Sequence, residues 1–531
     1  MDKYKFFMNQ DNTVYNNYKP LRNHLNKLVL DDSFYVIWSY IQHYQFNNKF
    51  PQDIEVAPEF LNQDHIQKIR MCSEWELETI TREIIINAQN STLSDKSLKT
   101  WSYFSGSINK LKNIENEIGG MFVNKDNILV ELFRISHRQF PWQIRPNGEY
   151  LTRYYKIFSQ ESLNKILVET IGFSAKELYL SGMLFIGAYL KSPAINLPIN
   201  VQVSAIKNEE VERFIKIFSL DINLLREKVK NEVQYNDKFA YSFSSLRSFP
   251  IIKMGYRQKE SLVCPMPTLL FWQITDGIYY KILEEIKKIK DGKKQKEILG
   301  NFGNSLGKQF QNYVGEVLEK SIQNESLKFF KEQEYKEGKN RKDTVDWIVI
   351  DNNAILFIEC KAKRMNLPAK IELNDDSFIK TELDKMADFI KQIYKSIDDY
   401  KNNKYPNIKY DKSRKIFPVI LTLEHWYLFG DKFLNELDAI LKNKIKENNL
   451  DEKYLEIYPY SICSIEEFEK MTQIIDKIGV SNFMSKKFDQ DRRLWAFQSF
   501  MNSDFNEEYK KTKVLFDDDY KKIFEEVLKE Y

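Results

Sequence analysis

The chain has 531 residues, a formal net charge of +3 at neutral pH, 43% hydrophobic residues and 14% aromatic residues. This length is too great for one ordinary domain, so we expect two or three domains with ample apolar material for their cores. The nearly balanced charge excludes a chain that binds nucleic acid through an overall basic field, so any such surface must be local.

The compartment follows from the cysteines and the apolar runs. Cys72, Cys264, Cys360 and Cys463 are widely separated, which argues against a disulfide framework or a cysteine zinc cluster and favours a reducing environment. The first five residues, Met1 to Lys5, lack the apolar core of a signal peptide, and the run 178–190 is too short to span a bilayer. We therefore expect a cytoplasmic protein that does not associate with a membrane.

Residues 1–290 are predicted to be mainly helical. Ser73-Glu-Trp-Glu76 is a capping box, and apolar residues at helical spacing follow it. Residues 221–233 have the pattern of a second amphipathic helix, whereas proline and glycine predict loops at 140–148 and 193–198. The polar and aromatic residues from Arg138 to Arg145 favour packing around Trp142 over a ligand-binding loop.

A lysine-rich stretch, 287–297, is typical of a solvated helix end next to a domain boundary, an interpretation that we prefer to a phosphate-binding strip. The predicted organisation is a helical recognition or regulatory region over 1–290, with two subdomains as an alternative, then a linker over 291–303. A second domain over 304–480 and a helical extension over 481–531 follow.

From residue 304 onward, helical and strand-like patterns alternate. The expected elements, in order, are a helix over 304–322, a strand over 329–335, a charged loop over 336–343, strands over 345–350 and 355–358, a helix over 379–400, a strand over 416–423, a helix over 433–445, a strand over 458–463 and a helix from the capping box at Ser464 to about 478. This order predicts an α/β domain with a mixed central sheet.

Charged residues interrupt the buried hairpin of this domain at three places. A turn of two or four residues within 351–354 places Asp346 directly opposite Glu359, with Cβ atoms about 4.5–5.5 Å apart. The alternation of side chains along a strand then places Lys361 on the same face as Glu359. Two carboxylates at that distance repel each other unless a cation lies between them, and Mg²⁺ prefers such oxygen ligands.

These residues resemble the motif of the PD-(D/E)xK nuclease superfamily over roughly 300–480. The matching positions are Glu316, Asp346, Glu359 and Lys361, and Leu306-Gly-Lys-Gln-Phe310-Gln-Asn-Tyr313 resembles the entry helix of many restriction-like members. Val345 stands where the proline that gives the motif its name would be. The resemblance implies a restriction-endonuclease-like α/β domain.

The resemblance also implies the chemistry of a metal-dependent nuclease. Asp346, Glu359, the backbone carbonyl of Cys360 and Glu316 would hold Mg²⁺, or Mn²⁺ in its place, against the scissile phosphate. Lys361 would orient or deprotonate the attacking water. Further candidates for contact with nucleic acid are Lys363, Lys339, Arg341 and Lys342, for which solvated surface is at least as good an interpretation. Gln392, on the helix after the hairpin, is another candidate.

The expected function is therefore Mg²⁺-dependent cleavage of DNA by an endonuclease, in the manner of restriction or anti-phage defence effectors. The N-terminal region would sense, recruit or restrain, through a protein partner or self-association. One alternative is a catalytically silent nuclease-like fold that binds nucleic acid or acts as a scaffold. Another is a nuclease that acts on RNA.

Overall fold

The computed structural model of the chain describes residues 12–57, 72–90, 94–199, 205–428 and 430–528, so the expected N-terminal segment 1–5 lies outside the described residues. The chain divides into two compact units. The first comprises Met1–Tyr155, Asn164–Leu299 and Asp518–Tyr531, and the second comprises Lys156–Leu163 and Gly300–Asp517.

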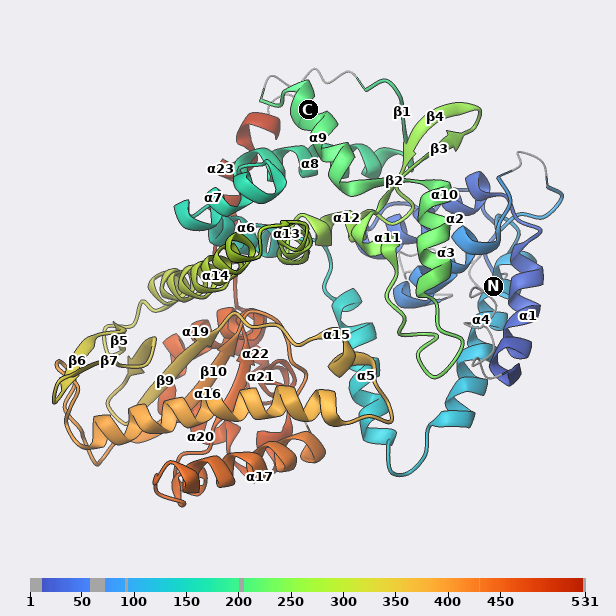
Figure 1. The fold of residues 1–531 in the computed structure, drawn as a ribbon. Helices are drawn as coiled ribbons and strands as arrows, with labels where there is room; N and C mark the ends of the chain where they lie inside the picture. Colours follow the sequence, from blue (N-terminus) through green and yellow to red (C-terminus); the bar gives the residue numbers. More distant parts are fainter. Residues whose placement is uncertain (1–11, 58–71, 91–93, 200–204, 429, 529–531) are drawn as a thin grey trace. The chain divides into compact units, whose positions relative to one another are not determined.

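The first unit is mainly helical, as predicted (Figure 1). Its helices are α1 (Asn12–Leu25), α2 (Leu30–Phe46), α3 (Glu74–Asn87), α4 (Trp101–Phe122), α5 (Ile128–Gln143), α8 (Ala175–Lys191), α9 (Asn208–Phe218), α10 (Ile222–Glu232), α11 (Ser245–Ser248), α12 (Pro267–Gln273) and α13 (Ile278–Lys287). Four further helices contain residues of both units: α6 (Gly148–Phe158), α7 (Glu161–Ile171), α14 (Gly292–Ser321) and α23 (Asp517–Leu528). Among the described residues, none of the helices combines the length and apolar character needed to cross a bilayer.

The first unit also contains a small sheet that the sequence did not predict. Its strands lie in the order β1-β4-β3-β2. They are β1 (Ala194–Asn196), β2 (Ser219–Asp221), β3 (Ile251–Tyr256) and β4 (Lys259–Val263). Strands of three to six residues are too short to show a clear alternation, and β1 lies within the segment expected to be a loop.

The predicted helix starts in this unit are confirmed. The backbone N–H of Ser73 donates to the Glu76 carboxylate at 2.7 Å, which closes the capping box at the start of α3. The Asp221 side chain accepts from two backbone N–H groups at the start of α10. The loop expected from residue 140 was placed too early, because α5 continues through Pro141 to Gln143.

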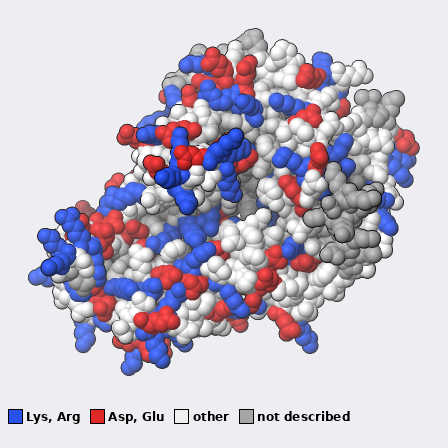
Figure 2. All heavy atoms as spheres, in the orientation of Figure 1, with Lys and Arg blue, Asp and Glu red and all other residues white. Residues whose placement is uncertain are grey.

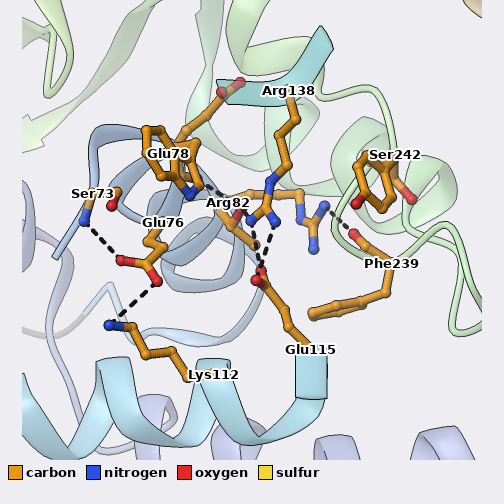
Figure 3. A network of polar contacts seen from close by, with 12 residues as sticks. Ser73, Glu76, Glu78, Arg82, Lys112, Glu115, Arg138, Phe239 and Ser242 are labelled. Atoms are coloured by element: carbon orange, nitrogen blue, oxygen red, sulfur yellow. Dashed lines mark hydrogen bonds and ion pairs between the residues drawn. The ribbon is translucent and has the colours of Figure 1, made fainter. Parts of the chain in front are cut away.

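A buried polar network surrounds Arg138 (Figure 3). Its guanidinium donates to both oxygens of Glu115, at 2.6 and 3.1 Å, and to Thr79. Trp142 is 1% exposed, packs against the ring of Trp272 and donates its indole N–H to Glu78 at 3.2 Å. The interpretation of this segment as packing is therefore confirmed.

The second unit is built on a mixed sheet of five strands in the order β11-β10-β9-β8-β5. They are β5 (Lys328–Lys331), β8 (Trp347–Ile350), β9 (Ala354–Lys361), β10 (Lys415–Thr422) and β11 (Ser461–Ser464). β9, β10 and β11 are parallel to one another, whereas β8 is antiparallel to both β9 and β5. The predicted α/β architecture with a mixed sheet is thus present.

Helices cover both faces of this sheet (Figure 1). The helices that belong to this unit are α15 (Leu367–Ile371), α16 (Ser377–Lys401), α17 (Asp431–Glu447), α18 (Tyr454–Ile457), α19 (Ile465–Ile478), α20 (Val480–Lys487), the 3₁₀ helix at Gln490–Leu494, α21 (Phe497–Asp504) and α22 (Asn506–Lys510). On one face, Tyr400 of α16 packs edge-on against Phe357 of β9, and α17 packs against α16. On the other face, the indole N–H of Trp347 donates to the carbonyl of Gln311 in α14 at 2.9 Å.

Two expectations about secondary structure in this part of the chain need correction. The linker expected at 291–303 contains the boundary between the two units, at Leu299 and Gly300, but it is helical from Gly292 onward, because its lysine, glutamine and glutamate residues are good helix formers. The charged loop expected at 336–343 is a hairpin of two strands, β6 (Glu334–Glu337) and β7 (Asn340–Asp343), which pair only with each other.

Candidate active site

The predicted hairpin register is confirmed. Trp347 lies opposite Ile358, and Ile350 lies opposite Ile355. The turn has two residues, since the N–H of Asp351 donates to the carbonyl of Ala354 at 3.0 Å. Asp346 directly precedes β8 and therefore lies opposite Glu359 of β9.

A β-bulge immediately precedes Asp346. The N–H of Glu332 donates to the carbonyl of Asp346 at 2.8 Å, whereas the N–H of Thr344 donates to the carbonyl of Gln333 at 3.0 Å. The paired positions Thr344 and Asp346 are two steps apart on one strand, whereas Glu332 and Gln333 are adjacent on the other, so Val345 is the extra residue. Such bulges bend a strand and re-aim the side chains beside them. The bulge lies at the position that proline would occupy in the resembled motif.

Asp346 contacts the end of β9. Its Oδ2 accepts a hydrogen bond of 2.6 Å from the backbone N–H of Cys360. This bond fixes the carboxylate beside Glu359, whose side chain comes from the preceding position and is almost fully buried. The structure thus brings the two predicted carboxylates together at the end of the hairpin.

Lys361 joins these carboxylates to helix α16. Its Nζ lies 2.7 Å from Oε1 of Glu359, donates to Oε1 of Gln392 at 3.1 Å and lies 4.9 Å from the centre of the Phe389 ring. Its side chain keeps 19% of its surface exposed. Gln392, a lower-ranked prediction, therefore lies in direct contact with a predicted catalytic residue. Phe389 was not predicted.

The pKa values of both hairpin carboxyl groups are raised above their usual range. Burial and then the negative charge of Glu359 raise the pKa of Asp346 to about 7, although the N–H of Cys360 opposes this effect. Burial also raises the pKa of Glu359, against the opposing effect of Lys361. Strong shifts of this kind are typical of carboxylates that share a site and need a cation to be ionised together.

Glu316 is engaged in an ion pair. It belongs to α14 and forms an ion pair of 2.9 Å with Lys156. The alternation of side chains places Asp346, Glu359 and Lys361 on the sheet face that α16 covers, and α14 covers the opposite face. A role for Glu316 beside the hairpin stays a prediction.

Glu332, which the sequence did not single out, is the acid that accompanies the hairpin carboxylates. It follows β5 directly, and its negative charge contributes to the raised pKa values of Asp346 and Glu359. Its carboxylate accepts from Nε2 of Gln311 at 3.0 Å and lies 3.2 Å from Nζ of Lys308. Only the pairing of β5 with β8 reveals this position, because the sequence separates Glu332 from Asp346 by the β6–β7 hairpin.

The remaining candidates for contact with nucleic acid lie in two places. Figure 2 shows Lys and Arg side chains gathered over the β6–β7 hairpin, which carries Lys339, Arg341 and Lys342. Arg341 is 73% exposed, whereas Lys342 pairs with Asp399 at 3.3 Å. Lys363 is exposed beyond the end of β9, where burial and the neighbouring Lys385 lower its pKa.

The oxygen atoms at the end of the hairpin supply part of the ligand set that a divalent cation needs. Two facing carboxylates supply the oxygen ligands that Mg²⁺ and Mn²⁺ prefer, and their raised pKa values indicate that a cation would relieve their repulsion. Within the described ranges of the chain, three or more His, Cys, Asp or Glu side chains do not converge in an arrangement that could hold a metal ion. The fit is therefore to an ion held by Asp346, Glu359 and the carbonyl of Cys360, with Glu316 left out.

The comparisons with known proteins give no relative: no protein-family model, curated protein or solved structure matches the chain. The resemblance to the PD-(D/E)xK nucleases therefore stays a prediction, and it depends on the residues and contacts described above.

Proposed function

We propose that the second unit is a restriction-endonuclease-like domain that hydrolyses phosphodiester bonds of nucleic acid, with DNA as the favoured substrate, by means of a divalent cation. The observation that carries the proposal is the facing pair Asp346 and Glu359, with Lys361 one step beyond on the same face. Phosphodiester hydrolysis needs a positioned water and neutralisation of the charge that develops on the phosphate.

The residues of the chain have distinct roles in this proposal. Lys361, held between Glu359 and Gln392, presents a positive charge and N–H donors to a phosphate oxygen or to the attacking water. Glu359 and Asp346 accept from that water and hold the cation together with the Cys360 carbonyl. When bound, the cation would neutralise phosphate charge and lower the pKa of a coordinated water. Gln392 is a positioning residue, because it acts through Lys361.

The first unit would decide when and where this chemistry occurs, through a protein partner or self-association. A nuclease joined to a larger helical region is the arrangement expected of a restriction or anti-phage defence effector. This biological role follows from the type of architecture.

A second candidate function has a specific observation in its favour. Glu316 forms an ion pair with Lys156, so one acid of the resembled motif is already engaged by a lysine. A nuclease-like unit that binds nucleic acid without cutting it would tolerate this arrangement.

The test is cleavage of plasmid, single-stranded DNA and RNA by the purified full-length protein, with Mg²⁺, Mn²⁺ or EDTA. Asp346→Asn, Glu359→Gln and Lys361→Met each remove one proposed function while keeping side-chain size. We expect each to reduce cleavage by about 100-fold or more, the scale on which a positioned acid, base or charge contributes. Gln392→Ala should reduce cleavage by about 10-fold, the lower end of effects from residues that orient a functional group.

Lys442→Met is the matched control, because Lys442 is exposed on α17, outside the site. Cleavage that survives all three substitutions would remove these residues from the mechanism. Nucleic-acid binding without cleavage of any substrate would establish the second candidate instead.

A further inference from the structure

The second unit has a groove of about 550 Å³ at the end of the sheet opposite the candidate active site. One part of its wall is formed where β5 begins and β8 ends, at the paired residues Lys328 and Ile350. The loop 407–414, which precedes β10, forms another part. Asp346 lies at the other end of β8. The groove is therefore separate from the hairpin carboxylates, and none of the candidate catalytic or nucleic-acid-contact residues named above lines it.

The charged side chains of the groove are mostly cations. Lys328, Lys409, Lys412 and Arg414 line it together with a single acid, Asp411. Asp411 is already engaged, since its Oδ1 accepts from the N–H and the hydroxyl of Ser413. The three lysines are exposed, so their charges face solvent.

One donor in the groove is buried without an acceptor. Nε of Arg414 lies 3.7 Å from Oδ2 of Asp411, which is too long for a hydrogen bond. Among the described residues, this buried N–H has no hydrogen-bond acceptor. The Arg414 guanidinium nevertheless lies in an ion pair with Asp411, so it adds positive charge to the lining of the groove.

Two half-buried aromatic rings, Phe330 and Tyr410, line the same groove. Tyr410 is held by an edge-to-face contact with Tyr400, and its backbone N–H donates to the side chain of Asn403 at 2.9 Å. Cations that follow a phosphate backbone, beside aromatic rings on which bases stack, are the combination by which proteins bind single-stranded nucleic acid. The volume is also within the range of about 300–1,000 Å³ that ligand sites occupy.

We propose that this groove binds a single-stranded segment of nucleic acid through its phosphates and one or two bases. The inference deepens the proposed function by naming a second contact for the same substrate. Ile350 is four residue steps from Asp346, which corresponds to about 14 Å at 3.4 Å per residue. A strand stacked with the 3.4 Å rise of duplex DNA would cover this distance in about four nucleotides.

The test measures binding of a fluorescently labelled single strand and of its duplex to the full-length protein, in EDTA and over a range of salt concentrations. Lys409→Glu combined with Lys412→Glu should weaken single-strand binding by about 10-fold or more and reduce the salt slope by roughly 1.5, the value for two lost phosphate contacts. Tyr410→Leu should weaken binding of the single strand by about five-fold without changing the salt slope, because stacking does not release counterions.

The matched control is Lys442→Glu combined with Lys446→Glu, which makes the same change in net charge on exposed positions of α17. An equal loss of affinity in this control would show that only net charge matters and would overturn the inference. Unchanged binding by the groove variants, or no binding of nucleic acid by the wild type, would overturn it too. Thermal unfolding of each variant shows whether the fold is retained.

The inference and the proposed function can fail separately. If the groove variants lose binding while the wild type cleaves nothing, the groove is established and the nuclease is not. If the wild type cleaves in an Asp346-dependent manner while the groove variants bind and cleave normally, the nuclease stands and the groove is refuted.

Discussion

Replacing Asp346 with asparagine is expected to stabilise the second unit when no divalent cation is present. The folded chain raises the pKa of this carboxyl from 3.8 to about 7, so the folded state holds the proton more tightly than the unfolded state does. Its contribution to stability is therefore fully present below about pH 4 and is lost as the pH rises through 7. Asparagine removes the charge, and its carbonyl oxygen can still accept from the N–H of Cys360.

The magnitude follows from the size of the shift. A rise of roughly three pH units corresponds to a ceiling of about 4 kcal/mol, since one unit is worth about 1.4 kcal/mol. Partial exposure of the side chain and coupling to Glu359 reduce this value, and we expect about 2 kcal/mol at pH 8. For a unit of this size, that corresponds to an increase of about 4–8 °C in Tm.

The assay is thermal unfolding in EDTA at pH 8 and at pH 5, where the increase should be smaller. Added Mg²⁺ should raise the Tm of the wild type at pH 8 and leave that of Asp346→Asn unchanged, because a ligand stabilises only the form that binds it. Asp388→Asn is the control, and it should lower the Tm at pH 8. Burial raises the pKa of Asp388, but ion pairs with Lys391 and Lys444 outweigh this effect and lower it. A lower Tm for Asp346→Asn at pH 8, or an effect independent of pH, would refute the reasoning.

Three further predictions concern stability. Gly315→Ala should destabilise the second unit by about 1–3 kcal/mol in denaturant unfolding, because a Cβ there would lie 2.3 Å from the Trp347 ring. Gly307→Ala, on the same helix, is the control: its Cβ meets no atom within 4 Å, so it should stabilise the unit by up to about 1 kcal/mol. Arg138→Met should cost the first unit about 2 kcal/mol by leaving the half-buried Glu115 without its partner, and adding Glu115→Gln should restore part of this loss in a double-mutant cycle. Tyr335→Phe removes the hydroxyl that donates to Asp399 at 2.5 Å, so it should cost about 1–2 kcal/mol and increase hydrogen exchange in the β6–β7 hairpin; unchanged exchange would show that this bond does not hold the hairpin.

The hairpin could be predicted from the sequence because its determinants are local. Apolar runs on both sides of Asp351-Asn-Asn define two strands and a short turn, and a turn of even length leaves only one register near Asp346 and Glu359. Helix α16 could also be predicted from the sequence, because its apolar residues recur at helical spacing along its whole length.

Other parts of the site depend on contacts between segments far apart in the chain. Glu332 reaches the carboxylates only because β5 pairs with β8. The bulge at Val345 arises from a change of register between the β5–β8 pair and the β6–β7 pair. The β6–β7 strands are rich in charged residues, so their sequence lacks the apolar alternation that predicts a strand. The contact of Glu316 with Lys156 joins segments that no local pattern connects.

The charges of the second unit suggest an order of events for the proposed nuclease. Beside the hairpin, Asp346, Glu359 and Glu332 outnumber the two lysines that contact them, Lys361 and Lys308, so this end of the sheet repels a phosphate until a cation is bound. The groove at the other end of the sheet has an excess of positive charge, with four cationic side chains and one acidic side chain. It should therefore attract a polyanion without a bound metal ion. Nucleic acid would therefore engage the groove first, and the cation would then admit it to the carboxylates. Asp346→Asn removes one negative charge, so in EDTA it should both raise the Tm and tighten the binding of nucleic acid. A substitution at a residue with a purely structural role would change the Tm alone.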